Sequence, residues 1–504
     1  MMEIPCGMQE QFLEAKELIE SSNDIKIYTH TDCDGICSGA ILSIILDRLN
    51  KDYEIEFVNL DEIEDLDLDH KLTIFSDLGS GQGVDKNAKD DQKILILDHH
   101  PPLRDINYKN DKAYTYLEIN PMFYGIDGSY YVCGGGLCYF LAKTFGFKDL
   151  SWIGVLSAIG DMQNNKTGHF EGLNEIIQED AINEGLLKVT KNDLNIYGRS
   201  TRPLYVALSY FSDVKLPITN NQQEAKVVLE ELGVDEKHNR KTLSEVTEED
   251  KMEIKKFLSR MISKRVPPKY LKYVPKLIVG DAYTFLNEEE GSFLRDGSEF
   301  STAMNACGRN RKEAIGVDII KGDRLVALDA LEEVSKTHKY NLATSISKVA
   351  DNYHSEIIEL DNFQYFDCSD FDEDIASNII GTITGMVLGY CNWKKPILGF
   401  SKPKNNQIKV SLRCSKLLAY DGIHFGNMMR EIAKEVGGTG GGHAIACGAY
   451  IPNEKKSEFL DKFNRKLQGK TNRTYQDTES NISSTENQDE ISTKSLDLTI
   501  ESPK

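Results

Sequence analysis

Short apolar runs alternate with longer amphipathic stretches over roughly the first 165 residues of the chain. "DIKIYTH" (24–30), "KLTIFSDL" (71–78) and "QKILILDHH" (92–100) are β-rich runs that end in polar residues. Neighbouring segments such as "ICSGAILSIILDRL" and "GGGLCYFLAKTF" carry apolar residues at the spacing typical of helices. Strands that alternate with helices in this way predict a largely parallel sheet with helices on both faces.

The pattern changes twice further along the chain. It becomes mostly helical and charged from about residue 185, and strands return from about residue 355. We therefore predict an α/β protein with an N-terminal domain built on a mainly parallel sheet (1–185), a mostly helical insertion and connector (186–350) and a smaller C-terminal α/β domain (351–470). The last residues, 471–504, are rich in Ser, Thr, Asn and Glu and predict a disordered acidic tail.

The overall composition is that of a globular protein without a membrane span. Hydrophobic residues make up 40% of the 504 positions, and no run of about 18 apolar residues occurs. The start of the chain lacks the basic and apolar regions of a signal peptide. The ten cysteines include no C-x-x-C pair, which favours free thiols over a disulfide or zinc framework. We therefore expect a reduced, cytoplasmic protein.

The charge of the chain is unevenly distributed. A formal net charge of −21 argues against indiscriminate nucleic-acid binding. Residues 255–280, however, contain eight basic and no acidic residues, with Tyr270 and Tyr273 among them, and residues 391–420 contain seven basic and no acidic residues. A basic run is usually only a solvated face, but two of them in an acidic protein predict places where phosphate groups bind.

Potential metal ligands follow three of the predicted strands. His30, Asp77 and Asp98 each stand at the end of a β-rich run, and sites in open α/β sheets form at the carboxyl ends of strands. These side chains should therefore converge, although His30 and Asp98 are far apart in the sequence. Asp161 ends the helix-like run "LSAIGD" and could reach the same edge.

The complete candidate set contains five carboxylates and three imidazoles: Asp32, Asp34, Asp77, Asp98, Asp161, His30, His99 and His100. So many carboxylates repel one another in one pocket unless cations neutralise them. Mixed oxygen and imidazole ligands suit Mn²⁺ or Mg²⁺ better than a thiolate-seeking metal. Two such ions about 3.5–4 Å apart, bridged by one carboxylate, are an established arrangement for hydrolysing phosphate esters. A stretch such as "SDLG" alone predicts only a turn, so the prediction depends on all the stretches together.

Four short motifs resemble those of the DHH phosphoesterase superfamily. They are "HTDCDG" from His30, "SDLG" from Ser76, "DHH" from Asp98 and "GD" from Gly160. "GGTGGGHAIACGA" (437–449) resembles the glycine-rich motif of the C-terminal domain associated with DHH proteins. The resemblance implies a two-domain phosphoesterase core.

Two segments of the middle region are similar to archaeal RecJ-like proteins of this superfamily. They are "GRSTRPL" (198–204) and "MNACGR" (304–309). That branch includes the GINS-associated nuclease and is related to the eukaryotic replication scaffold of the CMG helicase. The resemblance spans roughly residues 10–470 and leaves the tail outside it.

The resemblance implies a role for each motif residue. One Mn²⁺ would be held by His30, Asp32 and Asp77. The other would be held by Asp34, Asp77, His99 and Asp161, so that Asp77 bridges. His100 would face the scissile phosphate as a charge stabiliser or leaving-group acid, and Asp98 would orient the histidines. We therefore predict His100, Asp98 and Asp77 as catalytic residues.

The resemblance also implies substrate-binding residues beyond the metal ligands. These are Arg309, Arg413, Ser415, Gly440, Gly441, Gly442 and His443. Glycines let backbone N–H groups approach a phosphate closely, and His443 would add a donor. The residues alone are equally consistent with a tight turn between a helix and a strand, and with Arg309 in an interdomain ion pair.

The expected activity is that of a Mn²⁺-dependent exonuclease that releases 5′-mononucleotides from single-stranded DNA, RNA or both. Basic and aromatic residues near each other favour a single strand over a duplex. The resemblance implies a role in archaeal DNA replication or repair, with the GINS complex as a partner and no membrane. No residue separates a pocket for a 5′ end from one for a 3′ end, so both polarities stay open.

Three other functions fit part of the pattern. A small-substrate phosphodiesterase would act on nanoRNA or on linear and cyclic dinucleotides, but the insertion of roughly 170 residues favours a longer substrate. A manganese pyrophosphatase would share the N-terminal motifs but not the glycine-rich end. A replisome scaffold would need no activity, and the complete ligand set argues against it.

Overall fold

The computed structural model describes residues 2–468, apart from 60–61, 64–65, 67, 109–112, 235–240, 351–355 and 370–372. The predicted tail, 471–504, lies outside the described residues. The chain forms two compact units. The first unit comprises Met1–Ala207, Arg240–Val246 and Gly280–Asn341, and the second comprises Leu208–Asn239, Thr247–Val279 and Leu342–Lys504. The predicted domain boundaries remain a prediction.

A five-stranded parallel sheet forms the frame of the first unit, in the order β2-β1-β3-β4-β5. Its strands are β1 (Ile25–His30), β2 (Tyr53–Val58), β3 (Leu72–Ser76), β4 (Lys93–Leu97) and β5 (Thr115–Ile119). The first helices of the unit are α1 (Cys6–Glu20), α2 (Cys33–Arg48), α3 (Gly134–Thr144), α4 (Ser151–Gly160) and α5 (Leu173–Asn183). The predicted parallel sheet is therefore confirmed.

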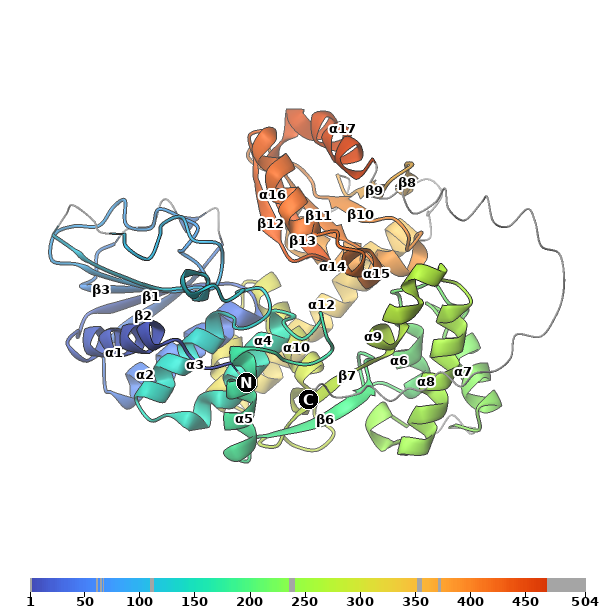
Figure 1. The fold of residues 1–504 in the computed structure, drawn as a ribbon, viewed down its shortest axis with the longest axis horizontal. Coiled ribbons are helices and arrows are strands. Elements are labelled where there is room, and N and C mark those ends of the chain that lie inside the picture. Colours follow the sequence, from blue (N-terminus) through green and yellow to red (C-terminus); the bar gives the residue numbers. More distant parts are fainter. Residues whose placement is uncertain are drawn as a thin grey trace. The chain divides into compact units, whose positions relative to one another are not determined.

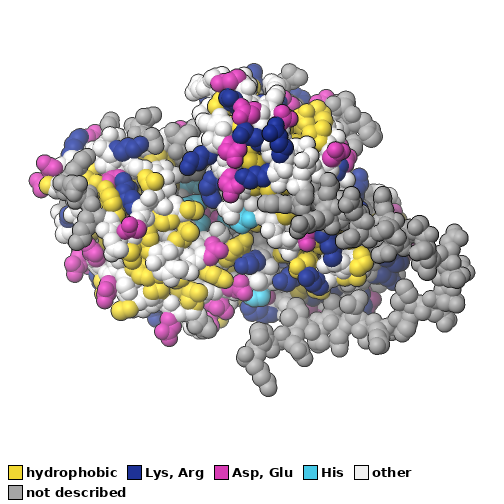
Figure 2. All heavy atoms as spheres, turned by 45° about the horizontal axis from the view of Figure 1, so that its top comes forward, with side chains coloured by type: hydrophobic (Ala, Val, Ile, Leu, Met, Phe, Trp, Pro, Cys, Tyr) yellow, Lys and Arg dark blue, Asp and Glu magenta, His cyan; other side chains and the backbone are white. Residues whose placement is uncertain are grey.

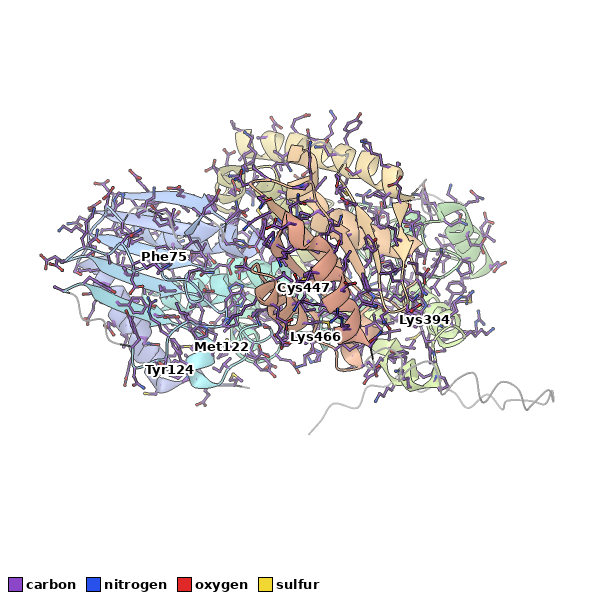
Figure 3. All side chains as sticks on the ribbon, turned by 90° about the horizontal axis from the view of Figure 1, so that it is seen from above. Phe75, Met122, Tyr124, Lys394, Cys447 and Lys466 are labelled. Atoms are coloured by element: carbon purple, nitrogen blue, oxygen red, sulfur yellow. The ribbon has the colours of Figure 1, made fainter. Side chains whose placement is uncertain are left out.

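Helices cover one face of this sheet rather than both. Helices α1, α2 and α3 pack against strand residues such as Ile27 and Ile74 (Figure 1). In the described part of the opposite face, Phe75 and its neighbours pack against connecting segments that contribute Ile63 and Val84. Figure 3 labels Phe75 on the sheet. The expectation of helices on both faces was wrong because the connections after β2 and β3 are rich in Asp and Gly, which favour turns.

The middle of the chain is mostly helical, as predicted. Its helices include α6 (Leu204–Ser209), α7 (Gln222–Glu231), α8 (Glu248–Ser263), η5 (Pro268–Tyr273), α9 (Val274–Ile278), α10 (Gly297–Arg309), α11 (Glu313–Ile320) and α12 (Val326–Ala350). A two-stranded sheet of β6 (Leu187–Leu194) and β7 (Val279–Phe285) was not predicted. Among the described helices, each is too short or too polar to cross a membrane.

A six-stranded sheet forms the core of the second unit, in the order β12-β13-β11-β10-β9-β8. Its strands are β8 (Ile358–Glu359), β9 (Gln364–Asp367), β10 (Ile397–Phe400), β11 (Gln407–Arg413), β12 (Thr439–Gly442) and β13 (Ala446–Pro452). The accompanying helices are α14 (Glu373–Val387), α15 (Lys416–Tyr420), α16 (Phe425–Glu435) and α17 (Lys456–Leu467). This mixed sheet, packed against α16 and α17, confirms the predicted C-terminal α/β architecture.

Candidate metal centre

The parallel sheet brings the candidate ligands to one edge. His30 is the last residue of β1, Asp77 directly follows β3, and Asp98 directly follows β4. These three strands are adjacent and parallel, so their carboxyl ends meet. Asp161 reaches the same edge from the end of α4.

Two groups of ligands stand side by side at this edge. In the first, the Nδ1 atom of His30 lies 3.0 Å from Oδ2 of Asp32 and 3.6 Å from Oδ2 of Asp77. In the second, His99 lies 3.6 Å from Asp34 through Nε2 and 3.8 Å from Asp161 through Nδ1. Within each group, one potential ligand atom from each residue lies within 4.8 Å of the others.

Asp77 links the two groups. Its Oδ1 atom lies 3.3 Å from Nε2 of His99, while Oδ2 faces His30. Within the described part of the chain, Oδ2 of Asp77 and Nε2 of His99 are buried without a hydrogen-bond partner. Leaving buried polar atoms unpaired is costly, and a divalent cation would satisfy both. The donor set therefore fits the metal ions that the sequence predicts.

The electrostatics of the cluster favour a bound cation. Burial and the nearby charges of Asp34 and Asp32 raise the pKa of Asp77 well above its usual value. Burial opposes a charged His99, but Asp161 and Asp77 outweigh it and raise the pKa of this imidazole. In the absence of metal the cluster thus retains protons, and a divalent ion must compete with them.

Asp34 is held by the amino end of α3. The backbone N–H groups of Gly134 and Gly135 donate to its two oxygens at 2.8 and 2.7 Å, and the hydroxyl of Ser157 donates to Oδ1. A Cβ atom at Gly134 would lie 2.6 Å from Cβ of Asp77, so only glycine fits there. Sequence analysis assigned no role to Gly134, Gly135 or Ser157, although a run of three glycines at the start of a helix was a signal.

The histidine pair is oriented by two different acceptors. Asp98 binds the Nδ1 atom of His100 at 2.8 Å and accepts from the backbone N–H of Ser80 at 2.9 Å. Nδ1 of His99 instead lies 2.7 Å from the carbonyl of Gly128, which directs Nε2 toward Asp77. Burial alone would raise the pKa of Asp98, but the charge and hydrogen bond of His100 lower it. The His100 side chain is 48% exposed, so the ring is partly accessible to solvent.

The segment "MNACGR" contacts the connection between β1 and α2, which we call the ligand loop. Oδ1 of Asn305 accepts the backbone N–H of Cys33 at 3.1 Å. A Cβ atom at Gly308 would lie 1.7 Å from the carbonyl oxygen of Thr31, so α10 can approach the loop only through a glycine. Arg309, a predicted substrate-binding residue, ends this helix. Sequence analysis assigned no role to Asn305 or Gly308.

The other predicted substrate-binding residues belong to the second unit. Gly440, Gly441 and Gly442 form most of the edge strand β12, rather than a tight turn, and His443 follows them. An edge strand presents unpaired backbone N–H groups to its surroundings.

Arg413 and Ser415 lie around the end of β11. Arg413 is the last residue of the strand, and its Nη1 atom donates to the carbonyl of Leu412 at 2.8 Å. Ser415 is buried and caps α15, because its hydroxyl accepts the backbone N–H of Leu417 at 3.3 Å.

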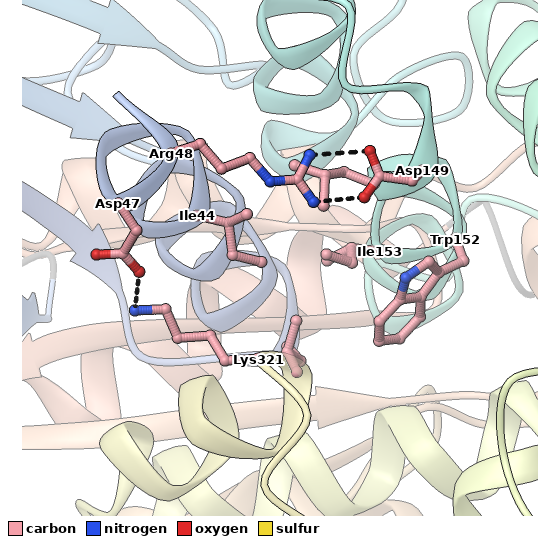
Figure 4. A pocket seen from close by; sticks show the side chains of 9 residues that line it. Ile44, Asp47, Arg48, Asp149, Trp152, Ile153 and Lys321 are labelled. Atoms are coloured by element: carbon pink, nitrogen blue, oxygen red, sulfur yellow. Dashed lines mark hydrogen bonds and ion pairs between the residues drawn. The ribbon is translucent and has the colours of Figure 1, made fainter. Parts of the chain in front are cut away.

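A cavity of about 460 Å³ opens at the far end of α2 from the ligand loop (Figure 4). Arg48, in the last turn of α2, pairs with Asp149, and Lys321 pairs with Asp47 at 2.6 Å. The cavity contains no predicted site residue. At about 1.5 Å per residue, α2 separates it from Asp32 by roughly 24 Å.

Comparison with known families gives three matches in chain order. Residues 24–155 match the DHH family, N-terminal domain, residues 196–274 match the DHH-CID domain, and residues 361–469 match the DHHA1 domain. An uncharacterised protein of Methanocaldococcus jannaschii is 31% identical over 446 residues, which cover 87% of this chain and 92% of that protein. The chain therefore belongs to the DHH superfamily.

Two solved structures share this fold. CDC45 from Entamoeba histolytica has a TM-score of 0.59 and 15% identity, over 91% of this chain and 99% of that one. RecJ from Thermus thermophilus, in complex with Mn²⁺, has a TM-score of 0.52 and 12% identity over 93% of this chain. The match covers 55% of that RecJ chain.

Proposed function

We propose that this protein is a Mn²⁺-dependent exonuclease that hydrolyses single-stranded DNA, RNA or both to 5′-mononucleotides in DNA replication or repair. The observation that carries the proposal is the position of Asp77, whose two oxygens face two separate ligand groups. This arrangement is the one that a pair of ions bridged by a carboxylate requires.

The residues of the centre divide into ligands and substrate-facing groups. His30, Asp32 and Asp77 would hold one ion, and the second would be held by Asp34, Asp77, His99 and Asp161. When bound, the two ions supply activation of water and stabilisation of phosphate charge. Oxygen and imidazole ligands without a thiolate suit Mn²⁺, and Mg²⁺ would also fit.

His100 is the best placed residue to act on the scissile phosphate. Asp98 fixes its Nδ1 atom and leaves Nε2 for a phosphate oxygen or for the leaving oxygen. The half-exposed ring would be open to a strand bound at the centre. His100 would therefore present Nε2 to the departing oxygen.

The test uses the full chain, Mn²⁺ and single strands labelled at either end, as DNA and as RNA. We expect release of mononucleotides from one end, its loss in His99→Ala and its loss after chelation of the metal. His70→Ala is the matched control, because His70 precedes β3 and so lies at the opposite edge of the sheet from the ligands. Metal analysis should give two Mn²⁺ per chain for the wild type.

Two other outcomes would overturn this proposal. Cleavage of dinucleotides or cyclic dinucleotides without cleavage of long strands would assign a small-substrate phosphodiesterase. A metal-loaded protein that is inert on every phosphodiester would assign a scaffold related to the CMG helicase subunit.

The proposed partner is the GINS complex. This assignment follows from the similarity of residues 198–204 and 304–309 to archaeal RecJ-like proteins. Affinity capture of the full chain from archaeal extract should enrich GINS subunits, and capture without such enrichment would contradict the assignment.

A further inference from the structure

The two acid-free basic stretches of the sequence meet on one surface of the second unit. Helix η5, from the first stretch, packs against α15, from the second. The rings of Tyr273 and Tyr420 lie 5.2 Å apart, and those of Tyr270 and Trp393 lie 6.3 Å apart. Two pairs of aromatic rings, each joining residues from both stretches, thus lie on this surface.

Lysine ammonium groups lie close to each of these rings. The Nζ atom of Lys272 lies 4.8 Å from the ring centre of Tyr273, and that of Lys276 lies 5.8 Å from that of Tyr420. Lys269 and Lys394 are placed in the same way over Tyr270 and Trp393. We call this set the tyrosine–lysine surface: Lys269, Lys272, Tyr273, Lys276, Lys394 and Tyr420. Figure 2 shows Lys and Arg side chains in several groups on the second unit.

The nearby carboxylates neutralise only part of this charge. Asp421 pairs with Lys269 at 2.7 Å and accepts from the hydroxyl of Tyr270 at 3.2 Å. Asp213 accepts the backbone N–H of Lys416 at 3.0 Å. Lys272 and Lys276 are exposed, and their ammonium groups lie over tyrosine rings. The surface is therefore locally positive in a chain whose net charge is −21.

We propose that the tyrosine–lysine surface binds single-stranded nucleic acid. The proposal rests on the proposed function and adds a binding surface outside the metal ligands, all of which belong to the first unit. Exposed lysines attract the phosphates, and a half-buried ring offers a rigid face on which an unstacked base can lie. A duplex keeps its bases stacked on each other, so these rings favour a single strand.

The first measurement is the affinity of the full chain for a labelled 20-nucleotide oligo-dT in the presence of a chelator, by fluorescence anisotropy. Lys272→Ala/Lys276→Ala should weaken binding by about tenfold and reduce the slope of log K against log salt by about 1.4, since each lost contact to a single strand removes about 0.7. Tyr273→Leu/Tyr420→Leu should weaken binding at least about fivefold, because it removes base stacking.

Lys462→Ala/Lys466→Ala is the matched control. It removes the same charge from α17 in the same unit, but these lysines already pair with Glu435 and Glu431. The control should bind oligo-dT with nearly wild-type affinity. Thermal unfolding of every variant would show that the fold is retained, and Lys272→Ala alone provides a milder change if the double variant does not fold.

The outcomes separate this proposal from the proposed function. Weaker binding by both surface variants, with wild-type hydrolysis of a trinucleotide, supports the surface. If the protein hydrolyses nothing but both variants still bind oligo-dT more weakly than the wild type, the exonuclease proposal would be wrong and the binding-surface proposal would be supported. Unchanged affinity in both variants would overturn the surface. The surface proposal would also be overturned if the wild type bound poly-glutamate tightly and only the lysine variant lost this binding. That result would indicate an acidic protein partner.

Discussion

At the scale of single residues, the centre is organised by side chains that hold other side chains. Asp77 adopts a left-handed backbone conformation, with φ of 59°, directly after β3. This conformation is uncommon for a residue other than glycine. It places one carboxylate between His30 and His99, and no other described carboxylate contacts both of these imidazoles. The function of the centre should therefore depend on Asp77 more than on any single outer ligand.

Replacement of this residue tests the bridge. Asp77→Ala should abolish hydrolysis, with a loss of more than about a hundredfold in rate. Removal of a ligand shared by two ions should lower activity more than removal of a residue that only orients a ligand. Calorimetric titration should show that tight binding of two Mn²⁺ is lost. Near-wild-type turnover in this variant would contradict the two-metal arrangement, and Asp149→Ala, at the cavity end of α2, is the control.

A second prediction concerns the stability of the fold as pH falls. Burial, with the positive charge of Arg309, lowers the pKa of His338 to about 4. Because folding depresses this pKa, the unfolded chain takes up a proton at a higher pH than the folded chain does. The free energy of unfolding therefore falls as pH drops from the ordinary pKa of 6.5 to about 4. The difference between these two pKa values corresponds to about 3 kcal/mol of unfolding free energy.

Urea unfolding between pH 7 and pH 4 measures this contribution. The free energy of unfolding of His338→Gln should fall less over this window than that of the wild type. The exposed His169 provides the control, since His169→Gln should follow the wild-type curve. Parallel curves for the wild type and His338→Gln would contradict the prediction.

At the scale of helices and strands, the approach of α10 to the ligand loop is the most sensitive contact. Gly308→Ala would force a methyl group onto the carbonyl of Thr31. Overpacking of this kind destabilises by about 1–3 kcal/mol. Here it should also displace Thr31 and Asp32, which lead into the first turn of α2 and Asp34.

We expect Gly308→Ala to lower Mn²⁺ affinity at least about tenfold while the rest of the fold persists. Gly81→Ala is the matched control, because a Cβ atom there would meet its nearest atom at 3.4 Å. Isothermal titration with Mn²⁺ and near-ultraviolet circular dichroism would measure the two effects. Equal metal affinity in both variants would show that α10 does not position the loop.

Sequence patterns placed the candidate ligands at one edge of the sheet but did not identify the residues that hold them. His30, Asp77 and Asp98 could be placed because strand ends in a parallel sheet converge, whatever the rest of the fold. Asn305 could not be placed, because its partner Cys33 is 272 positions away and no local pattern records such a contact. Gly440–Gly442 were equally consistent with a tight turn, because glycine is rare in strands, but close packing of β12 against its neighbours requires glycine there.

At the scale of the whole molecule, the last described helix, α17, completes the hydrophobic core of the second unit. Phe459, Phe463 and Leu467 of α17 are fully buried in the core of the second unit. Residues beyond 470 come after α17 in the sequence and contain no motif of the superfamily. Hydrolysis should therefore depend on the chain up to α17.

Truncation gives the corresponding prediction. A chain that ends at Lys470 should hydrolyse single strands at the wild-type rate, within about twofold, and should unfold at the same temperature. A chain that ends at Lys455, before α17, should fail to fold its second unit because it exposes the core that these phenylalanines cover. A large loss of activity in the first truncation would show that the tail takes part in the reaction.

The contact between α10 and the ligand loop also determines when the centre can form during synthesis. A ribosome releases every ligand, from His30 to Asp161, well before it releases Gly308. The loop gains its support only after about three fifths of the chain has been made, since α10 ends at residue 309 of 504. We therefore expect metal loading to be a late event during synthesis. A product that stops before α10 would carry the motifs of the superfamily without the contact from Asn305 and Gly308.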